Sequence, residues 1–174
     1  MELRIENKKL KSQIEDLEQK ILTIVGRFQI ESSGEGKNKN LLNEKILEFI
    51  DTTPDQLNIV SPKIDAFYIE ELKKATKRGI PVLLITRDRR LMPDKNYKKN
   101  YDELKNIQGI SVINNPNVTY LLIFNSEQAL YSGGSLDKEE IDNSVLIVTT
   151  IKETQSLRKI AKIFSMMLPS FMRV

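Results

Sequence analysis

Apolar residues recur along the first thirty residues at alternating spacings of four and three, which is the heptad pattern of a coiled coil. The residues expected to dimerise are Leu3, Asn7, Leu10, Ile14, Leu17 and Ile21, and the pattern continues to Ile24 and Phe28. Isoleucine at position a with leucine at position d favours a coiled coil of two parallel helices. Asn7 at an a position selects the register, because only the Asn7 of the second copy can satisfy its amide. We therefore expect a parallel homodimer. The alternative is a single amphipathic helix folded onto its own domain.

The end of this helix is ambiguous in the sequence. Residues 22–30 are rich in β-branched and aromatic side chains and fit a strand as well as a helix. We expect the coiled coil to end between Lys20 and Ile24, which divides the chain into a dimerisation helix over residues 1–22 and an α/β domain over residues 23–174. Residues 31–39, with the sequence ESSGEGKNK, have the composition of a flexible loop.

From residue 41 onward, helical and strand patterns alternate. Helices are predicted over residues 41–50, 64–78, 97–107 and 154–167, and strands over residues 57–60, 81–86, 110–113, 119–125, 129–132 and 145–149. Strand–helix–strand units imply a parallel core with right-handed crossovers. The strands on either side of Ser126 and Glu127 are close enough in sequence to form a hairpin. The predicted fold is therefore α/β, with a mixed sheet flanked by helices and a coiled-coil helix at the N-terminus.

Composition narrows the class of protein. The chain is 40% hydrophobic and 29% charged, as in globular proteins, and no apolar run approaches the ~20 residues of a membrane span. Its first residues are densely charged, unlike a secretory signal, and cysteine is absent, so we expect a cytoplasmic protein without disulfides. Histidine is also absent, which excludes imidazole as nucleophile, general base or zinc ligand. We expect no metal, no cofactor and no membrane partner.

The net charge of +3 is too small to indicate a nucleic-acid partner, but its distribution is uneven. Residues 87–99 contain six basic side chains against two acidic ones, and the basic ones are Arg87, Arg89, Arg90, Lys95, Lys98 and Lys99. Tyr97 and Tyr101 are interleaved with them. In a dimer this segment would occur twice and could contact DNA phosphates. The alternative is a solvated loop and helix face.

Two blocks of sequence resemble the phospholipase-D superfamily. A strand ending in Ser61-Pro62 leads through a helix to residues 75–82, ATKRGIPV, which is similar to the family's A-x-x-R-G-V-x-V turn and strand. Residues 118–125 and 129–135 then lie where the family has its H-x-K-x4-D and G-S-x-N motifs. The resemblance covers most of residues 22–168 and implies the half-domain fold of that family.

The family's catalytic residues are missing at the corresponding positions. The resemblance implies a histidine that attacks phosphorus, a lysine that holds phosphate and an aspartate that orients the site. Here those places fall on Val118, Tyr120 and Asn125, to within about a residue, and the chain has no histidine at any register. The chain therefore cannot form a covalent intermediate on an imidazole. We expect a scaffold that binds without catalysis, and hence a protein that is not an enzyme.

A narrower resemblance is to the effector domain of TrmB-like transcriptional regulators, which are found chiefly in archaea. Those proteins join a DNA-binding winged helix to a dimerising helix and a sugar-binding phospholipase-D-like domain, and the winged helix is missing here. Open α/β sheets bind ligands at their strand ends, so we expect a cleft there for a sugar-like or phosphorylated ligand. Its candidate polar residues are Ser61, Arg87, Tyr120, Asn125, Ser132 and Ser135. Each could instead satisfy a turn or cap an element. The expected role is a dimeric effector in transcription regulation, and the alternative is a DNA-binding dimer that uses residues 87–99.

Overall fold

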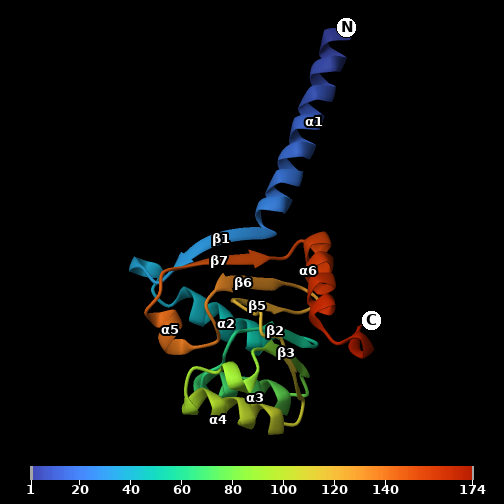
Figure 1. Ribbon diagram of the computed structural model, residues 1–174. Coiled ribbons are helices and arrows are strands. Elements are labelled where there is room, and N and C mark those ends of the chain that lie inside the picture. Colours follow the sequence, from blue (N-terminus) through green and yellow to red (C-terminus); the bar gives the residue numbers. More distant parts are fainter. Residues whose placement is uncertain (1, 174) are drawn as a thin grey trace.

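The computed structural model of the protein describes the backbone of residues 2–173, and the side chains in that range except those of residues 2–5, 19 and 22–25. It contains a single seven-stranded sheet with the strand order β1-β7-β6-β5-β2-β3-β4, and helices cover both of its faces (Figure 1). The strands are β1 (Phe28–Ser33), β2 (Leu57–Val60), β3 (Val82–Thr86), β4 (Ile110–Asn114), β5 (Tyr120–Phe124), β6 (Ala129–Gly133) and β7 (Leu146–Ile151). The α-helices are α1 (Glu2–Val25), α2 (Leu41–Thr52), α3 (Ala66–Lys77), α4 (Lys95–Asn106), α5 (Lys138–Asp142) and α6 (Thr154–Met167).

The sheet is mixed, as the sequence predicts. β2, β3 and β4 are parallel, because a helix connects each strand to the next and returns the chain to the same edge. β5 runs antiparallel to β2 and pairs Ile123 with Ile59, and β6 and β7 follow with antiparallel pairing. The hairpin near Phe124 therefore lies beside the strand that ends in Ser61, which the predicted fold requires.

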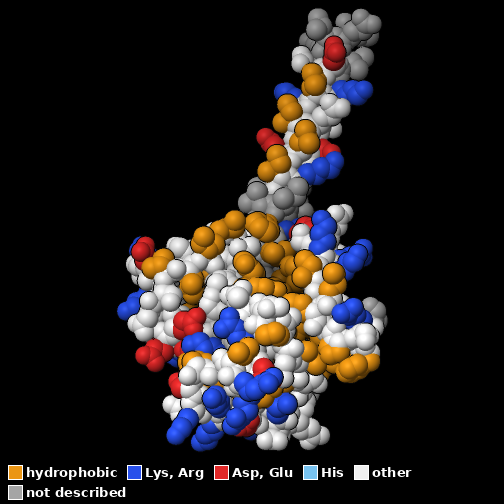
Figure 2. All heavy atoms as spheres, in the orientation of Figure 1, with side chains coloured by type: hydrophobic (Ala, Val, Ile, Leu, Met, Phe, Trp, Pro, Cys, Tyr) orange, Lys and Arg blue, Asp and Glu red, His pale blue; other side chains and the backbone are white. Residues whose placement is uncertain are grey.

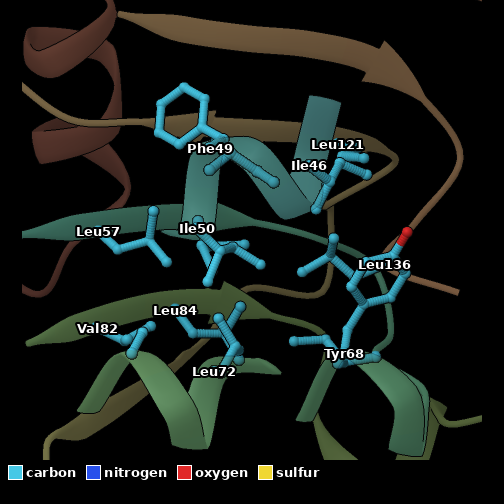
Figure 3. Close-up of a cluster of buried hydrophobic side chains, with 14 of the residues drawn as sticks. Ile46, Phe49, Ile50, Leu57, Tyr68, Leu72, Val82, Leu84, Leu121 and Leu136 are labelled. Atoms are coloured by element: carbon cyan, nitrogen blue, oxygen red, sulfur yellow. The ribbon is translucent and has the colours of Figure 1, made fainter. Parts of the chain in front are cut away.

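One face of the sheet carries the larger core. Helices α2, α3, α4 and α5 pack against it, and Tyr68 and Leu72 of α3 are fully buried against β2 and β3 (Figure 3). Alternation along β3 sends Leu84 into this core, whereas Ile85 points to the opposite face. A strand that is apolar on both sides requires cover on both faces, which explains the continuous apolar sequence of β3.

Helix α6 covers only part of the second face. Leu157 and Phe164 of α6 pack onto the sheet, and the ring of Phe164 meets that of Phe124 edge-on at 5.0 Å between centroids. Closer to β1 the same face is open, and Ile30 and Ile147 are 64% and 68% exposed. The molecule therefore presents apolar strand surface beside the base of α1, as the upper part of the body in Figure 2 shows.

Helix α1 projects away from the body as a single rod (Figure 1). Its heptad residues Leu10, Ile14, Leu17 and Ile21 are 51–57% exposed, so they do not pack against the domain. This excludes the alternative in which the helix folds back onto the body. The side chains of Leu3 and Ile24, which belong to the same pattern, lie outside the described residues.

Most predicted boundaries agree with the structure to within two residues, and three features of the prediction need further correction. The first helix continues to Val25 rather than ending before Ile24, and the residue that follows it is Gly26, a poor helix former. Part of the predicted flexible loop is strand, since residues 31–33 complete β1 and pair with β7. Helix α5 was not predicted, because its five residues contain one apolar side chain, Ile141. None of the helices described between residues 2 and 173 combines the length and apolar character of a membrane span.

Candidate functional site

A polar cavity of about 510 Å³ lies at one edge of the sheet, where β2, β3 and β6 end and β5 begins. It is lined by Pro62, Lys63, Arg87, Leu91, Pro93, Thr119, Gly134, Ser135 and Glu140. The volume is in the range of small-molecule sites in proteins. Two larger hollows, of about 680 and 710 Å³, lie at the opposite edge and beside α6, but no carboxylate lines either of them. The edge cavity is therefore the candidate site.

Lys63 is the centre of a charged cluster in this cavity. Its amine donates to Asp137 at 2.7 Å and is 2.9 Å from a carboxylate oxygen of Glu140. The hydroxyl of Tyr97 on α4 also donates to Asp137, and Lys63 Nζ lies 4.6 Å from the centre of the Tyr97 ring. Ser135 completes the cluster, because its hydroxyl donates to Glu140 at 2.7 Å. Three segments of the chain thus meet at a single amine.

The cluster shifts the pKa values of its members. Burial by itself lowers the pKa of the Lys63 amine, but the hydrogen bonds to Asp137, Glu140 and Tyr97 outweigh burial and raise it. Burial likewise opposes ionisation of Asp137, yet the bonds from Lys63 and Tyr97 leave its pKa below the ordinary value. Burial and the bond to Asp137 together raise the pKa of Tyr97. At neutral pH the site therefore holds an ammonium, a carboxylate and a neutral phenol.

Two loops that hold the cluster are tied together by hydrogen bonds. Ser61 Oγ donates to the carbonyl of Lys63 at 2.6 Å and accepts from the amide of Leu136 at 2.9 Å. The carboxylate of Asp65 caps α3 and also accepts from the amide of Lys138 at 2.7 Å. Asp137 in turn caps α5 with its second oxygen. These bonds tie the backbone on either side of Lys63 to the segment that carries Asp137.

Arg87 faces the cluster from the end of β3. Its Nε donates to the carbonyl of Val118 at 2.7 Å, which holds the guanidinium at the cavity wall. Lys63 and Arg87 balance Asp137 and Glu140, so the formal charge of these four side chains is zero. A neutral site with donors and acceptors suits a ligand rich in hydroxyl groups. Among the described residues, no three carboxylates converge to hold a metal ion.

The predicted ligand residues divide between this cavity and other places. Arg87 and Ser135 line the cavity, and Ser61 supports it from behind. The remaining three are Tyr120, Asn125 and Ser132, and none of them lines it.

Each of these three has a local role. Tyr120 points to the α6 face, where its hydroxyl is 3.7 Å from the sulfur of Met167. Asn125 lies at the opposite edge of the sheet and closes the β5–β6 turn by accepting from the amides of Glu127 and Gln128. Ser132 is buried and donates to the carbonyl of Ile147. The expectation that all six share one cleft is therefore wrong, because strand alternation and strand length separate these three from it.

The predicted basic segment forms a loop, the 3₁₀ turn Arg89–Leu91 and the start of α4, and much of its charge is compensated. Arg89 pairs with Asp102 at 2.7 Å and Arg90 with Asp88 at 2.9 Å. Tyr101 is buried, with its hydroxyl donating to Asn114, so its ring is not available for stacking on a base. Lys95, Lys98 and Lys99 remain on the surface of α4 without an ion pair in the described part of the chain.

Sequence reasoning missed the residues that dominate the site: Lys63, Tyr97, Asp137 and Glu140. Lys63 and Asp137 are 74 residues apart in sequence, and no motif of short spacing links them. A usable signal was their position, since Lys63 directly follows Ser61-Pro62 at a strand end and Asp137 follows the turn at Gly133 and Gly134.

Comparison with known proteins identifies the architecture. No protein-family model matches the sequence, and no curated protein matches it in sequence. The fold matches NucT from Helicobacter pylori with a TM-score of 0.67 at 12% identity, over 80% of this chain and 95% of that one. It also matches Nuc from Salmonella typhimurium, a phospholipase D family member, with a TM-score of 0.58 at 17% identity, over 79% of this chain and 90% of that one. The chain has the phospholipase-D-like fold.

A third match has the same phospholipase-D-like fold and is longer than this chain. TrmBL2, an archaeal chromatin protein whose structure shows a novel mode of DNA binding, gives a TM-score of 0.57 at 17% identity. The match covers 95% of this chain but 61% of TrmBL2. The predicted resemblances to phospholipase D and to TrmB-like proteins are thus both confirmed at the level of the fold.

The comparison contradicts the expectation that the chain is not an enzyme. Its phospholipase-D-like neighbours include proteins named as enzymes, among them the polyphosphate kinase from Porphyromonas gingivalis, with a TM-score of 0.61 at 13% identity over 83% of this chain and 26% of that one. The expectation depended on the missing histidine, which excludes one nucleophile only. Other titratable groups remain, because Lys63 lines the cavity and donates to the hydroxyl of Tyr97. The absence of one residue type was too narrow a basis for excluding catalysis.

Proposed function

We propose that this domain is the ligand-sensing effector domain of a dimeric, DNA-associated regulatory protein. The observation that carries the proposal is the cavity around Lys63, where polar groups converge from four segments. Binding sites of this kind need few polar groups but need them fixed in place. The tied loops at Ser61 and Asp65 provide that fixation.

The charges in the cavity favour a sugar-like ligand over a phosphorylated one. Lys63 is already neutralised by two carboxylates, which leaves Arg87 as the cation available to an incoming anion. A phosphate group would also approach Glu140, and like charges at short range repel. Hydroxyl groups, by contrast, can donate to Glu140 and accept from Arg87. The proposed ligand is therefore a neutral, polyhydroxylated molecule.

The proposal is tested by thermal shift with neutral mono- and disaccharides, each compared with its phosphate ester. A ligand that binds only the folded state at 100 times its Kd adds about 2.7 kcal/mol, which raises the melting temperature of a domain of this size by roughly 5–10 °C. We expect at least one neutral sugar to raise the melting temperature, and its phosphate ester to raise it less. No shift across the neutral panel at millimolar concentration would contradict the proposal, and a larger shift with the esters would contradict the choice of ligand.

A pair of arginine variants separates binding from folding. Arg87→Met removes a donor at the cavity wall, and Arg78→Met removes a similar arginine at the opposite edge, where it donates to the carbonyl of Ile50. Both lose a bond from a guanidinium to a backbone carbonyl, so their effects on stability should be similar. We expect only Arg87→Met to abolish the shift with the ligand.

A second candidate function is direct DNA association by the dimer. The match to TrmBL2 favours it. That match covers 95% of this chain, and because only 149 of the 174 residues follow Val25, the matched region must include part of α1 as well as the body. The exposed heptad residues of α1 support a coiled-coil partner, and a second copy of the chain is the partner that Asn7 would select. The proposed assembly is a parallel homodimer that contacts nucleic acid.

A further inference from the structure

Basic side chains gather along α6 rather than along the predicted segment 87–99. Residues 152–173 contain Lys152, Arg158, Lys159, Lys162 and Arg173 against the single acidic residue Glu153. All five basic residues are exposed. Figure 2 shows Lys and Arg side chains spaced along the helix at the side of the body that Figure 1 labels α6.

The charges on α6 are not compensated by the protein. Among the ion pairs of the described residues, none involves Arg158, Lys159 or Lys162. The carboxylate of Glu153 is committed to the start of the helix, where it accepts from the amides of Gln155 and Ser156 at 2.7 and 2.6 Å. The two exposed arginines at 89 and 90, in contrast, each have a carboxylate partner.

The geometry of α6 turns these charges into a fixed row. Arg158 and Lys162 are four residues apart and Lys159 and Lys162 three, so they share the outer face of the helix. Leu157 and Phe164 anchor the inner face in the core. Like charges at these spacings destabilise a helix by a few tenths of a kcal/mol per pair. A polyanion bound along the row would remove that repulsion.

The row continues towards the base of α1. The amide of Lys152 donates to the carbonyl of Arg27 at 2.6 Å, which places the residue before β1 next to the residue after β7. Arg27 is exposed like the others. We define the α6 ridge as Arg27, Lys152, Arg158, Lys159 and Lys162. It joins the end of the proposed dimerisation helix to the flank of the body.

We propose that the α6 ridge binds the phosphate backbone of duplex DNA. This inference rests on the proposed DNA association and names its contact surface. A duplex carries one negative charge per about 1.7 Å of its axis, so several phosphates come within reach of a row of cations on one helix. An anionic membrane is the weaker partner, because a helix that binds a membrane inserts a continuous apolar face, and most of the apolar face of α6 is packed on the sheet, with Ile163 and Met166 left exposed.

The test measures binding of a fluorescent 30-base-pair duplex to the full chain by anisotropy, across 50–200 mM salt. The ridge variant is Arg158→Gln, Lys159→Gln and Lys162→Gln. The matched control is Lys95→Gln, Lys98→Gln and Lys99→Gln on α4, which removes the same charge. All six residues are surface residues, so both variants should melt as the wild type does. We expect the ridge variant to bind at least 10-fold more weakly at 100 mM salt and the control to stay within 2-fold. Loss of three phosphate contacts should also flatten the slope of log K against log salt by about 2–3.

The outcomes separate this inference from the function on which it rests. If the wild type binds DNA and the ridge variant binds equally well, the ridge is wrong and DNA association stands. If the α4 variant loses affinity instead, the contact surface is the segment 87–99. If the wild type binds no duplex at 50 mM salt, both DNA association and the ridge are refuted. Binding to vesicles with anionic lipid but not to the duplex would assign the ridge to a membrane surface.

Discussion

Replacement of Lys63 by methionine tests whether the charged cluster is held together by its amine. The variant keeps the length of the side chain but removes the cation, so Asp137, whose side chain is 4% exposed, loses its charged partner. Loss of a partner for a buried charge costs about 3–5 kcal/mol when nothing replaces it. Here Tyr97 and the amide of Glu140 still donate to Asp137. The lost ion pair with Glu140 adds little, because that carboxylate is 33% exposed. We therefore expect a loss of about 2–3 kcal/mol in the free energy of unfolding at pH 7.

The loss of stability in Lys63→Met should depend on pH. The pKa of Asp137 is depressed in the folded protein, so its contribution to stability is present above the unfolded pKa of about 3.9 and is lost as the pH falls through the folded value. Without Lys63 the burial of Asp137 is no longer opposed by the amine, and its pKa rises. At low pH the variant holds a neutral carboxyl that no longer needs the cation. The difference in the free energy of unfolding between Lys63→Met and the wild type should therefore shrink as the pH falls below about 5.

The assay is urea unfolding at pH 7 and at pH 4, with melting temperature as a second readout. We expect Lys63→Met to melt roughly 4–12 °C below the wild type at pH 7. Lys74→Met is the control, since its amine is 60% exposed and pairs with Glu71 on the same helix, and it should change stability by less than about 0.5 kcal/mol. An equal loss for Lys63→Met at both pH values would refute the electrostatic account, because a packing defect does not depend on the protonation of Asp137.

Three further outcomes follow from the fold. Leu10→Asp with Leu17→Asp should convert the proposed dimer to a monomer in light scattering with no change in the melting of the body, and an unchanged mass would contradict the proposed coiled coil. Leu72→Ala should cost about 2–5 kcal/mol in urea unfolding, because the side chain is fully buried, and a loss below 1 kcal/mol would show that the core closes around the gap. Gly34→Ala should destabilise more than Gly79→Ala. Both glycines have positive φ, but only at Gly34 would a Cβ meet a backbone oxygen, that of Ser144, at 2.0 Å, and equal melting temperatures would exclude this clash.

The core of the fold was readable from the sequence because its signals are local. A continuous apolar run such as residues 81–86, with a helical pattern on either side, fits a parallel strand covered on both faces, and β3 is such a strand. The terminal helix was placed at its observed limits, Thr154 and Met167, since its apolar spacing is regular and Glu153 caps it. Helix α5 gave no such signal, because five residues with one apolar side chain have no period to detect.

The site was less accessible to sequence reasoning for a physical reason. Residues of opposite charge pair in the folded structure although they are distant in sequence. Asp102 pairs with Arg89 from thirteen residues away, and Asp137 pairs with Lys63 from 74 residues away. A count of basic residues over 87–99 therefore overestimated the free charge there. The same count gives an equal excess of four positive charges for residues 152–173, but there the cations are spaced among apolar residues and become a row only when the helix forms.

The junction between α1 and β1 has a mechanical consequence. Only two residues, Gly26 and Arg27, connect the helix to β1, and β1 pairs with β7 along its whole length, so the connection between helix and sheet is short. A rod of 24 residues is about 36 Å long, and a rotation of about 5° at its base moves its tip by about 3 Å. The strand that ends at the cavity, β6, is two strands from β1. A slight change of sheet twist would thus be magnified into a larger displacement at the far end of α1.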